Sequence, residues 1–145
     1  MTRAWVRFPL SAQDSYGLLV RSYETMDSLF NFEKLEVYKR TVNFVNQVYK
    51  ITKLWSRDLS FSLTDQFRRA SLSIALNIAE GASRTKPEFK RFITISRGSA
   101  HECIPILEIA EKQGIINKKR KEELREEIII ISKMLSKLKN SIRIS

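Results

Sequence analysis

The chain has 145 residues, of which 43% are hydrophobic, 4 are Gly and 3 are Pro, and its formal net charge is +10. This length suits one compact unit with its own core, and the scarcity of Gly and Pro favours long helices over a turn-rich β architecture. A single cysteine, Cys103, excludes an intrachain disulfide and a cysteine-based metal site, and is typical of a reducing cytoplasm. The positive charge indicates an attraction to polyanions such as nucleic acid, although basic proteins without that role are common.

The sequence predicts neither a membrane span nor a signal peptide. Its longest uninterrupted apolar run, residues 128–131, is far shorter than the ~20 residues that cross a bilayer. Near the N-terminus, charged residues such as Arg7 and Asp14 interrupt the apolar stretches, so the continuous apolar segment of a signal peptide is missing. We therefore expect a cytoplasmic protein.

Residues 1–31 do not share the periodicity of the rest of the chain. A proline, a glycine and scattered serines break this stretch, so we expect a peripheral or poorly ordered N-terminal extension. Met26 is a candidate for the natural start, since it directly precedes the segment DSLFNFEKLEVYKR. The alternative is a short packed arm anchored by Trp5 and Phe8.

Residues 32–145 are predicted to form an all-α, antiparallel, up-and-down four-helix bundle, with helices at about 33–55, 64–84, 86–113 and 118–142. In each helix, apolar or small residues recur at spacings of three and four, which indicates one buried face. The predicted buried faces are Leu35, Tyr38, Val42, Val45, Tyr49 and Thr52 in the first helix; Phe67, Ala70, Ile74, Ile78 and Gly81 in the second; Phe89, Ile93, Ser96, Ala100, Cys103, Leu107 and Ala110 in the third; and Leu124, Ile128, Ile131, Leu135, Leu138 and Ile142 in the fourth.

Recognised boundary signals separate these helices. Residues 60–64 are expected to lie between the first and second helices, with a serine or threonine there capping the second. Thr85 followed by Glu88 predicts a capping box at the start of the third helix. Gly114 suits the left-handed residue that ends this helix, and Asn117 suits the N-cap of the fourth.

Pro105 falls inside the third helix and conflicts with this pattern. A proline there removes the hydrogen bond to the carbonyl of His101 and bends the axis. We expect one kinked helix, because two separate helices meeting at Pro105 would break a buried face that continues to Ala110.

The segment LTDQFRRASLSIALNIAEGASR and the later segment FKRFITISRGSAHE together resemble the four-helix bundle proteins encoded in 23S rRNA intervening sequences. That family is similar in turn to the accessory proteins of diversity-generating retroelements. The resemblance covers residues 32–143, and it implies a barrel-like homopentamer. For the retroelement branch it also implies a basic surface that binds nucleic acid and a reverse transcriptase, whereas the rRNA-encoded branch has no assigned biochemical role.

The family pattern can be carried over residue by residue. In this sequence it corresponds to Arg69, Ser73, Asn77, Glu80, Gly81, Arg84, Phe89, Phe92, Arg97, Ser99 and Glu102. The chain departs from the pattern at Ile104 and Pro105, where the family leads one to expect an uninterrupted helix. We therefore expect the third helix to differ in straightness from the family pattern, together with the neighbouring subunit contact that the resemblance implies.

The sequence indicates no enzyme. A di-iron bundle needs Glu-x-x-His pairs from two helices, but the single histidine, His101, has no acidic residue three positions before it. His101 and Cys103 are two apart on a helix and therefore point to different faces. Glycine-rich phosphate loops are missing as well. We expect no catalytic residue, no metal ligand and no cofactor.

Four polar residues in the second and third helices are candidates for a structural network. Asn77, Glu80, Arg84 and Glu102 invite a functional interpretation, because polar groups inside a bundle are costly without partners. Glu80 precedes Arg84 by four residues, which is the favoured order for a helical ion pair. We favour a network that determines helix register or subunit contacts.

A basic stripe and a basic run are the candidate nucleic-acid contacts. Along the third helix, Lys86, Lys90, Arg97 and His101 lie within about 60° of one another, and we call them the basic stripe. Phosphate groups suit such a stripe, and a solvated helix face is the alternative. The predicted nucleic-acid-binding residues are Arg68, Arg69, Arg84, Lys86, Lys90, Arg97, Lys118, Lys119, Arg120 and Lys121.

The last four of these residues open the fourth helix, where the helix dipole disfavours positive charge. Four cations at a helix end that disfavours positive charge suggest a binding site. The alternative is that they are simply solvated, because salt screens exposed charges and makes this position only slightly unfavourable. Farther along the same helix, Ile129 and Ile130 point in different directions off the buried face, so one core cannot cover both. They predict an oligomer interface.

These features lead to one functional hypothesis and one rival. The hypothesis is a non-enzymatic, homo-oligomeric accessory or scaffold protein that binds RNA or DNA through phosphate and shape, with a reverse transcriptase as a further candidate partner. The rival is a protein-interaction module that binds an acidic protein and has no direct nucleic-acid role. Neither involves a membrane or a small-molecule substrate.

Overall fold

The computed structural model describes residues 30–144, apart from the side chains of residues 58–61. The chain divides into two units, Met1–Asn31 and Phe32–Ser145. The candidate start at Met26 and the alternative anchors Trp5 and Phe8 lie outside the described residues.

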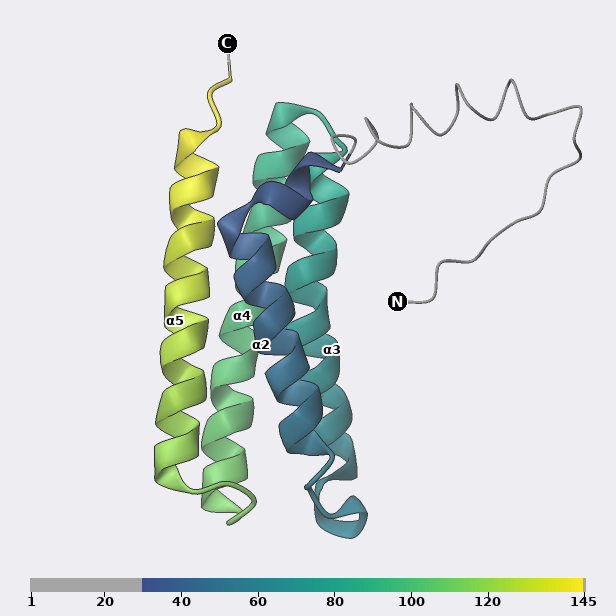
Figure 1. Cartoon of the computed structure of the whole chain (residues 1–145). Coiled ribbons are helices and arrows are strands. Elements are labelled where there is room, and N and C mark those ends of the chain that lie inside the picture. The colour runs from purple at the N-terminus through teal and green to yellow at the C-terminus, as the bar shows by residue number, and fades with distance from the viewer. Residues whose placement is uncertain (1–29, 145) are drawn as a thin grey trace, which may run out of the picture. The chain divides into compact units, whose positions relative to one another are not determined.

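The second unit is the predicted all-α four-helix bundle (Figure 1). Antiparallel helices follow one another along the chain, and residues 30–144 contain no strand. Each helix packs against two others, most extensively between the second and third helices and least between the first and last. No helix in this part of the chain is long and apolar enough to span a membrane. The helices are α2 (Glu36–Thr52), α3 (Arg57–Ala82), α4 (Lys86–Lys112) and α5 (Lys118–Ser141), and a short 3-10 helix, η2 (Asn31–Lys34), precedes them.

The predicted buried faces of α3, α4 and α5 are confirmed. The face of α3 lies wholly inside the bundle, as does that of α4 except for the half-buried Phe89. In α5 the face is buried as far as Leu135, while Leu138 and Ile142 are half-buried near the end of the helix. In these three helices the row of apolar and small residues found from the spacing is the one that the other helices cover.

The buried face predicted for α2 is wrong. The structure buries Val37, Thr41, Phe44, Val48 and Thr52, whereas the predicted residues other than Thr52 are half-buried or exposed. Two rows of mainly apolar residues run side by side along α2. One row is offset from the other by one position in the sequence, which is about 100° around the helix. The row that contains Phe44 is the one buried in the core, and the centre of the Phe44 ring lies 6.3 Å from that of the Phe67 ring.

The start of α3 also differs from the prediction. This helix begins at Arg57, not near residue 64, and it runs through the segment that was expected to be a connection. That segment contains hydroxyl residues but no Gly or Pro, so nothing in it prevents a helix from forming. The actual turn is shorter, and Trp55 stacks within it against Phe67 at 5.9 Å between ring centroids.

The other boundary signals are confirmed. At the start of α4, the Glu88 carboxylate accepts hydrogen bonds from the Thr85 backbone N–H at 3.1 Å and from its hydroxyl at 2.6 Å. Gly114 has a φ of 70°, and the Asn117 side chain caps α5 by accepting a bond from the Arg120 N–H. The helix α4 runs through Pro105 as one element, so the alternative of two helices is wrong, and the bend stays a prediction.

Candidate functional site

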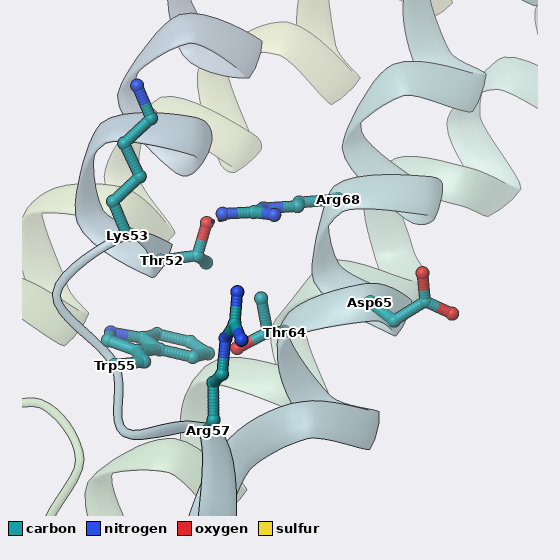
Figure 2. Close-up of a pocket in the computed structure, with 7 residues that line it drawn as sticks. All are labelled: Thr52, Lys53, Trp55, Arg57, Thr64, Asp65 and Arg68. Carbon is teal, nitrogen blue, oxygen red and sulfur yellow. Dashed lines mark hydrogen bonds between the residues drawn. The ribbon is translucent and has the colours of Figure 1, made fainter.

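A cavity of about 560 Å³ opens at the corner where α2 ends and α3 begins (Figure 2). Its position follows from the short turn between the helices, because the buried Trp55 fills the inside of that turn and leaves polar side chains around the rim. We call this cavity the corner pocket, and it is lined by Thr52, Lys53, Trp55, Arg57, Thr64, Asp65 and Arg68.

Arg68 is held in place on one side of the corner pocket. Its Nε donates to the Thr52 hydroxyl at 2.8 Å, and its guanidinium carbon lies 4.9 Å from the centre of the Tyr49 ring. The Thr52 hydroxyl donates in turn to the Val48 carbonyl at 2.7 Å. A guanidinium fixed in this way loses little side-chain freedom when it binds an anion.

No acid among the side chains that the structure describes neutralises the positive charge of the corner pocket. Lys53 and Arg57 are exposed and form no ion pair within the described part of the chain. Asp65 also lines the pocket, but its carboxylate accepts from Arg69 at 3.0 Å and points away from the centre. Arg57 and Arg68 approach the same space from below and above in Figure 2. The arrangement favours an anion between them.

Part of the basic stripe lies beside α5, while Lys86 and His101 are exposed. Two side chains on this side of α4 contact α5: His101 lies 3.2 Å from the Ser132 hydroxyl, and Thr94 accepts a hydrogen bond from Lys139 at 2.8 Å. Lys90 and Arg97 are half-buried, and the Nε of Arg97 is buried without a hydrogen-bond partner in the described structure. The middle of the stripe, Lys90 and Arg97, is therefore less accessible to a ligand than its two ends.

The predicted cations also do not form one surface. Arg84 and Lys86 lie at the α3–α4 turn, whereas residues 118–121 lie at the α4–α5 turn. The helix between these turns, α4, has 27 residues and is therefore ~40 Å long. A single short segment of nucleic acid cannot contact both groups through the same surface.

Several of the predicted cations are already paired with acids. Arg84 pairs with Glu80, and this contact raises the pKa of the Arg84 guanidinium. In the basic run, Lys121 pairs with Glu111, which raises the pKa of the lysine ammonium. Arg120 pairs with Glu123 at 2.7 Å. Within that run, Lys118 and Lys119 are left exposed and unpaired in the described structure.

The fold gathers a different set of cations at one end of the bundle. Because the helices alternate in direction, the α2–α3 turn and the α4–α5 turn lie at the same end (Figure 1). Exposed basic residues without ion-pair partners in the described chain surround both turns. We call this set the basic end: Lys50, Lys53, Arg57, Lys112, Lys118 and Lys119.

Sequence reasoning missed part of this site. Lys53, Trp55 and Arg57 were not proposed as binding residues, because the α2–α3 turn was expected farther along the chain. The signal was present in the segment KLWSRD, where two cations flank a tryptophan. That combination is typical of surfaces that bind nucleic acid, since aromatic rings and cations contact bases and phosphates.

Comparison with known proteins gives the family. Residues 33–137 match the 23S rRNA-intervening sequence proteins. The chain belongs to this family. The fold is also similar to a crystal structure of a protein with unknown function from the S23 ribosomal protein family of Bacteroides thetaiotaomicron, with a TM-score of 0.64 and 19% identity over 72% of this chain and 96% of that one. No curated protein is significantly similar to the chain.

The residues that resemble the family pattern do not form the single polar network that was predicted. Asn77 donates to the Ser73 carbonyl at 2.8 Å, and the Ser73 hydroxyl lies 2.8 Å from that of Ser99, which links α3 to α4. Glu80 and Arg84 form a separate pair that is about half exposed. Glu102 is exposed and has no hydrogen bond or ion pair in the described structure. Of the four predicted residues, only Asn77 therefore takes part in contacts that link α3 to α4, and the Ser96 hydroxyl adds a second link by donating to the Ile74 carbonyl at 2.8 Å.

The predicted interface residues Ile129 and Ile130 are both half-buried within the bundle itself. The neighbouring helices therefore cover more of both side chains than the helical wheel indicated. More exposed apolar side chains lie on α3, where Leu76 is 57% exposed. Together with the unselected apolar row of α2, they form an apolar groove lined by Tyr38, Val42, Val45, Asn46, Leu72, Ala75, Leu76 and Ala79.

Proposed function

We propose that the protein is a non-enzymatic, homo-oligomeric accessory protein that binds nucleic acid through its phosphate groups and shape, with the basic end as the contact surface. One observation carries this proposal. Two turns that are distant in sequence place exposed, unpaired cations at one end of a rigid bundle. Such cations replace the counterions around a phosphate backbone, which gives affinity without reading the bases.

The chemistry of the described residues supports a binding role over catalysis. Burial raises the pKa of the Cys103 thiol to about 12, so this group is not a thiolate nucleophile at neutral pH. His101 contacts Ser132, but no carboxylate in residues 30–144 hydrogen-bonds to the histidine to orient it. A nucleophile with its base usually needs that third group.

Binding to labelled single-stranded and duplex RNA and DNA, measured by fluorescence anisotropy at several salt concentrations, tests the proposal. We expect affinity to fall steeply as salt rises. The triple variant Lys112→Glu, Lys118→Glu, Lys119→Glu should bind at least about tenfold more weakly than the matched control Arg125→Glu, Lys133→Glu, Lys137→Glu. The control changes the same charge on exposed positions of α5 outside the basic end. Equal losses in both variants would contradict a localised contact.

The unpaired cations of the basic end also favour a second candidate function, an interaction with an acidic protein partner. Exposed, unpaired cations attract any polyanion, including an acidic polypeptide. Undetectable binding to every nucleic acid in the anisotropy experiment, together with salt-sensitive binding to an acidic polypeptide such as polyglutamate, would favour this candidate.

Self-association is part of the proposal, and the apolar groove supports it. Leu76 and Leu72 would lose their water contact in an assembly. Light scattering should give a multiple of the 16.9 kDa chain mass, and five chains per particle is the number that the family resemblance implies. A mass equal to one chain would contradict this part.

A further inference from the structure

The corner pocket has the composition of a site for a single phosphate group. Three of its lining residues are cations, Lys53, Arg57 and Arg68, while its one acid, Asp65, is paired with Arg69 outside the pocket. Arginine donates parallel hydrogen bonds that match two oxygens of a phosphate. The net charge at the rim therefore favours an anion, and its donors favour phosphate geometry.

Arg57 and Arg68 would contribute differently to anion binding, because Arg68 is held by other side chains and Arg57 is not. Arg68 is already oriented by Thr52 and Tyr49, so its remaining N–H groups are available at a fixed position. Arg57 has no hydrogen-bond or ion-pair partner in the described chain, and it closes on the same space from the other side. It is also the first residue of α3, where the helix dipole adds positive potential.

The size of the corner pocket indicates more than an isolated ion. A volume of about 560 Å³ is within the range of pockets that hold small organic ligands. The Trp55 indole and the Thr64 side chain both line the pocket. The Thr64 hydroxyl forms no hydrogen bond among the described residues and is available to a ligand. These groups suit the sugar or base attached to a phosphate.

We propose that the corner pocket binds one phosphate group of a nucleotide between Arg57 and Arg68, with the attached nucleoside next to Trp55. The phosphate can belong to a polynucleotide strand or to a free nucleotide. If the phosphate belongs to a polynucleotide strand, this inference rests on the nucleic-acid binding proposed above. If the phosphate belongs to a free nucleotide, the inference does not depend on that function.

Tryptophan fluorescence of the full chain tests this inference. In a Trp5→Phe background, emission reports on Trp55 alone, since the sequence has 2 tryptophans. Inorganic phosphate, adenosine monophosphate and a short single-stranded oligonucleotide are added at constant ionic strength, with sodium chloride as the reference. We expect a saturable change with the phosphate-bearing probes and none with chloride.

Arg57→Gln removes a charge and a donor from the pocket, and Arg125→Gln removes the same charge from an exposed position of α5. We expect the first variant to bind the phosphate probes roughly ten- to a hundredfold more weakly and the second to bind them as the parent does. Arg57 is exposed and has no hydrogen bond or ion pair among the described residues, so both variants should keep the parent's helical circular dichroism.

The outcomes separate the two proposals. If the probes change Trp55 emission no more than chloride does, or if Arg57→Gln and Arg125→Gln bind alike, the pocket is not a phosphate site, even where the basic end binds nucleic acid. If the free nucleotide binds through Arg57 but no oligonucleotide binds, the pocket stands and the proposed function fails. Binding of the oligonucleotide through Arg57 supports both and assigns the phosphate to the strand.

Discussion

The backbone of Gly81 in α3 lies directly against Phe92 in α4. A Cβ atom at position 81 would lie 2.5 Å from the Phe92 Cβ and 2.9 Å from the Phe89 Cδ2. Gly81 lies within the helix and its φ is not positive, so the glycine is required by the close approach of the helices and not by an unusual backbone conformation. This contact brings α3 and α4 together next to the turn that joins them.

Gly81→Ala should therefore destabilise the bundle. The added methyl group meets a Cβ and not the flexible end of a side chain, so the helices must separate locally, at a cost of about 1–3 kcal/mol. Urea unfolding followed by circular dichroism measures this loss. Gly98→Ala is the matched control, since no atom outside its own stretch of helix lies within 4 Å of the place that the new methyl group would occupy. We expect this control to stabilise the protein by about 0.5–1 kcal/mol, because alanine restricts the unfolded chain.

Cys103 should make the stability of the protein sensitive to alkaline pH. Burial, and secondarily the charge of Glu102, raises the pKa of its thiol from 9.0 to about 12. Between these values the unfolded chain has released the thiol proton while the folded chain retains it. The free energy of unfolding therefore falls as pH rises above 9, by about 1.4 kcal/mol per pH unit, and the group has little influence below pH 9.

The comparison of the parent with Cys103→Ala at pH 8 and pH 10 isolates this effect from the titration of lysine and tyrosine. We expect the parent to lose about 1.4 kcal/mol more than the variant between these pH values. The alanine variant is less stable at both pH values because it leaves a small cavity, but that offset cancels in the difference. The same pH dependence in both proteins would show that the thiol ionises freely in the folded state.

Pro105→Ala should stabilise the protein. Pro105 lies inside α4 and is exposed, so alanine restores an N–H for the carbonyl of His101 without removing buried contacts. We expect a gain of about 1–3 kcal/mol, measured by thermal and urea unfolding. Pro87→Ala is the control, because Pro87 lies in the first turn of the same helix and should have little effect. A loss of stability in Pro105→Ala would mean that the packing of α4 needs the proline.

The candidate site was only partly predictable, because the neutralisation of charge depends on partners that are distant in sequence. Arg40 forms two hydrogen bonds with Glu127, at 2.8 and 3.0 Å, although the two residues are 87 positions apart in the sequence. Lys121 meets Glu111 only because the α4–α5 turn folds the two helices together. Composition indicates an excess of cations, but it does not identify those that remain unpaired.

By itself the sequence determined the helical class, the antiparallel bundle, the buried faces of α3 to α5 and the caps at Thr85, Gly114 and Asn117. These features follow from spacing within one helix or from contacts between residues a few positions apart, and such signals are local. Only the tertiary structure decided which of two apolar rows on α2 enters the core and that Arg57 and Arg68 share a pocket. Both depend on how neighbouring helices pack, and periodicity in one helix carries no information about the side chains that another helix brings to it.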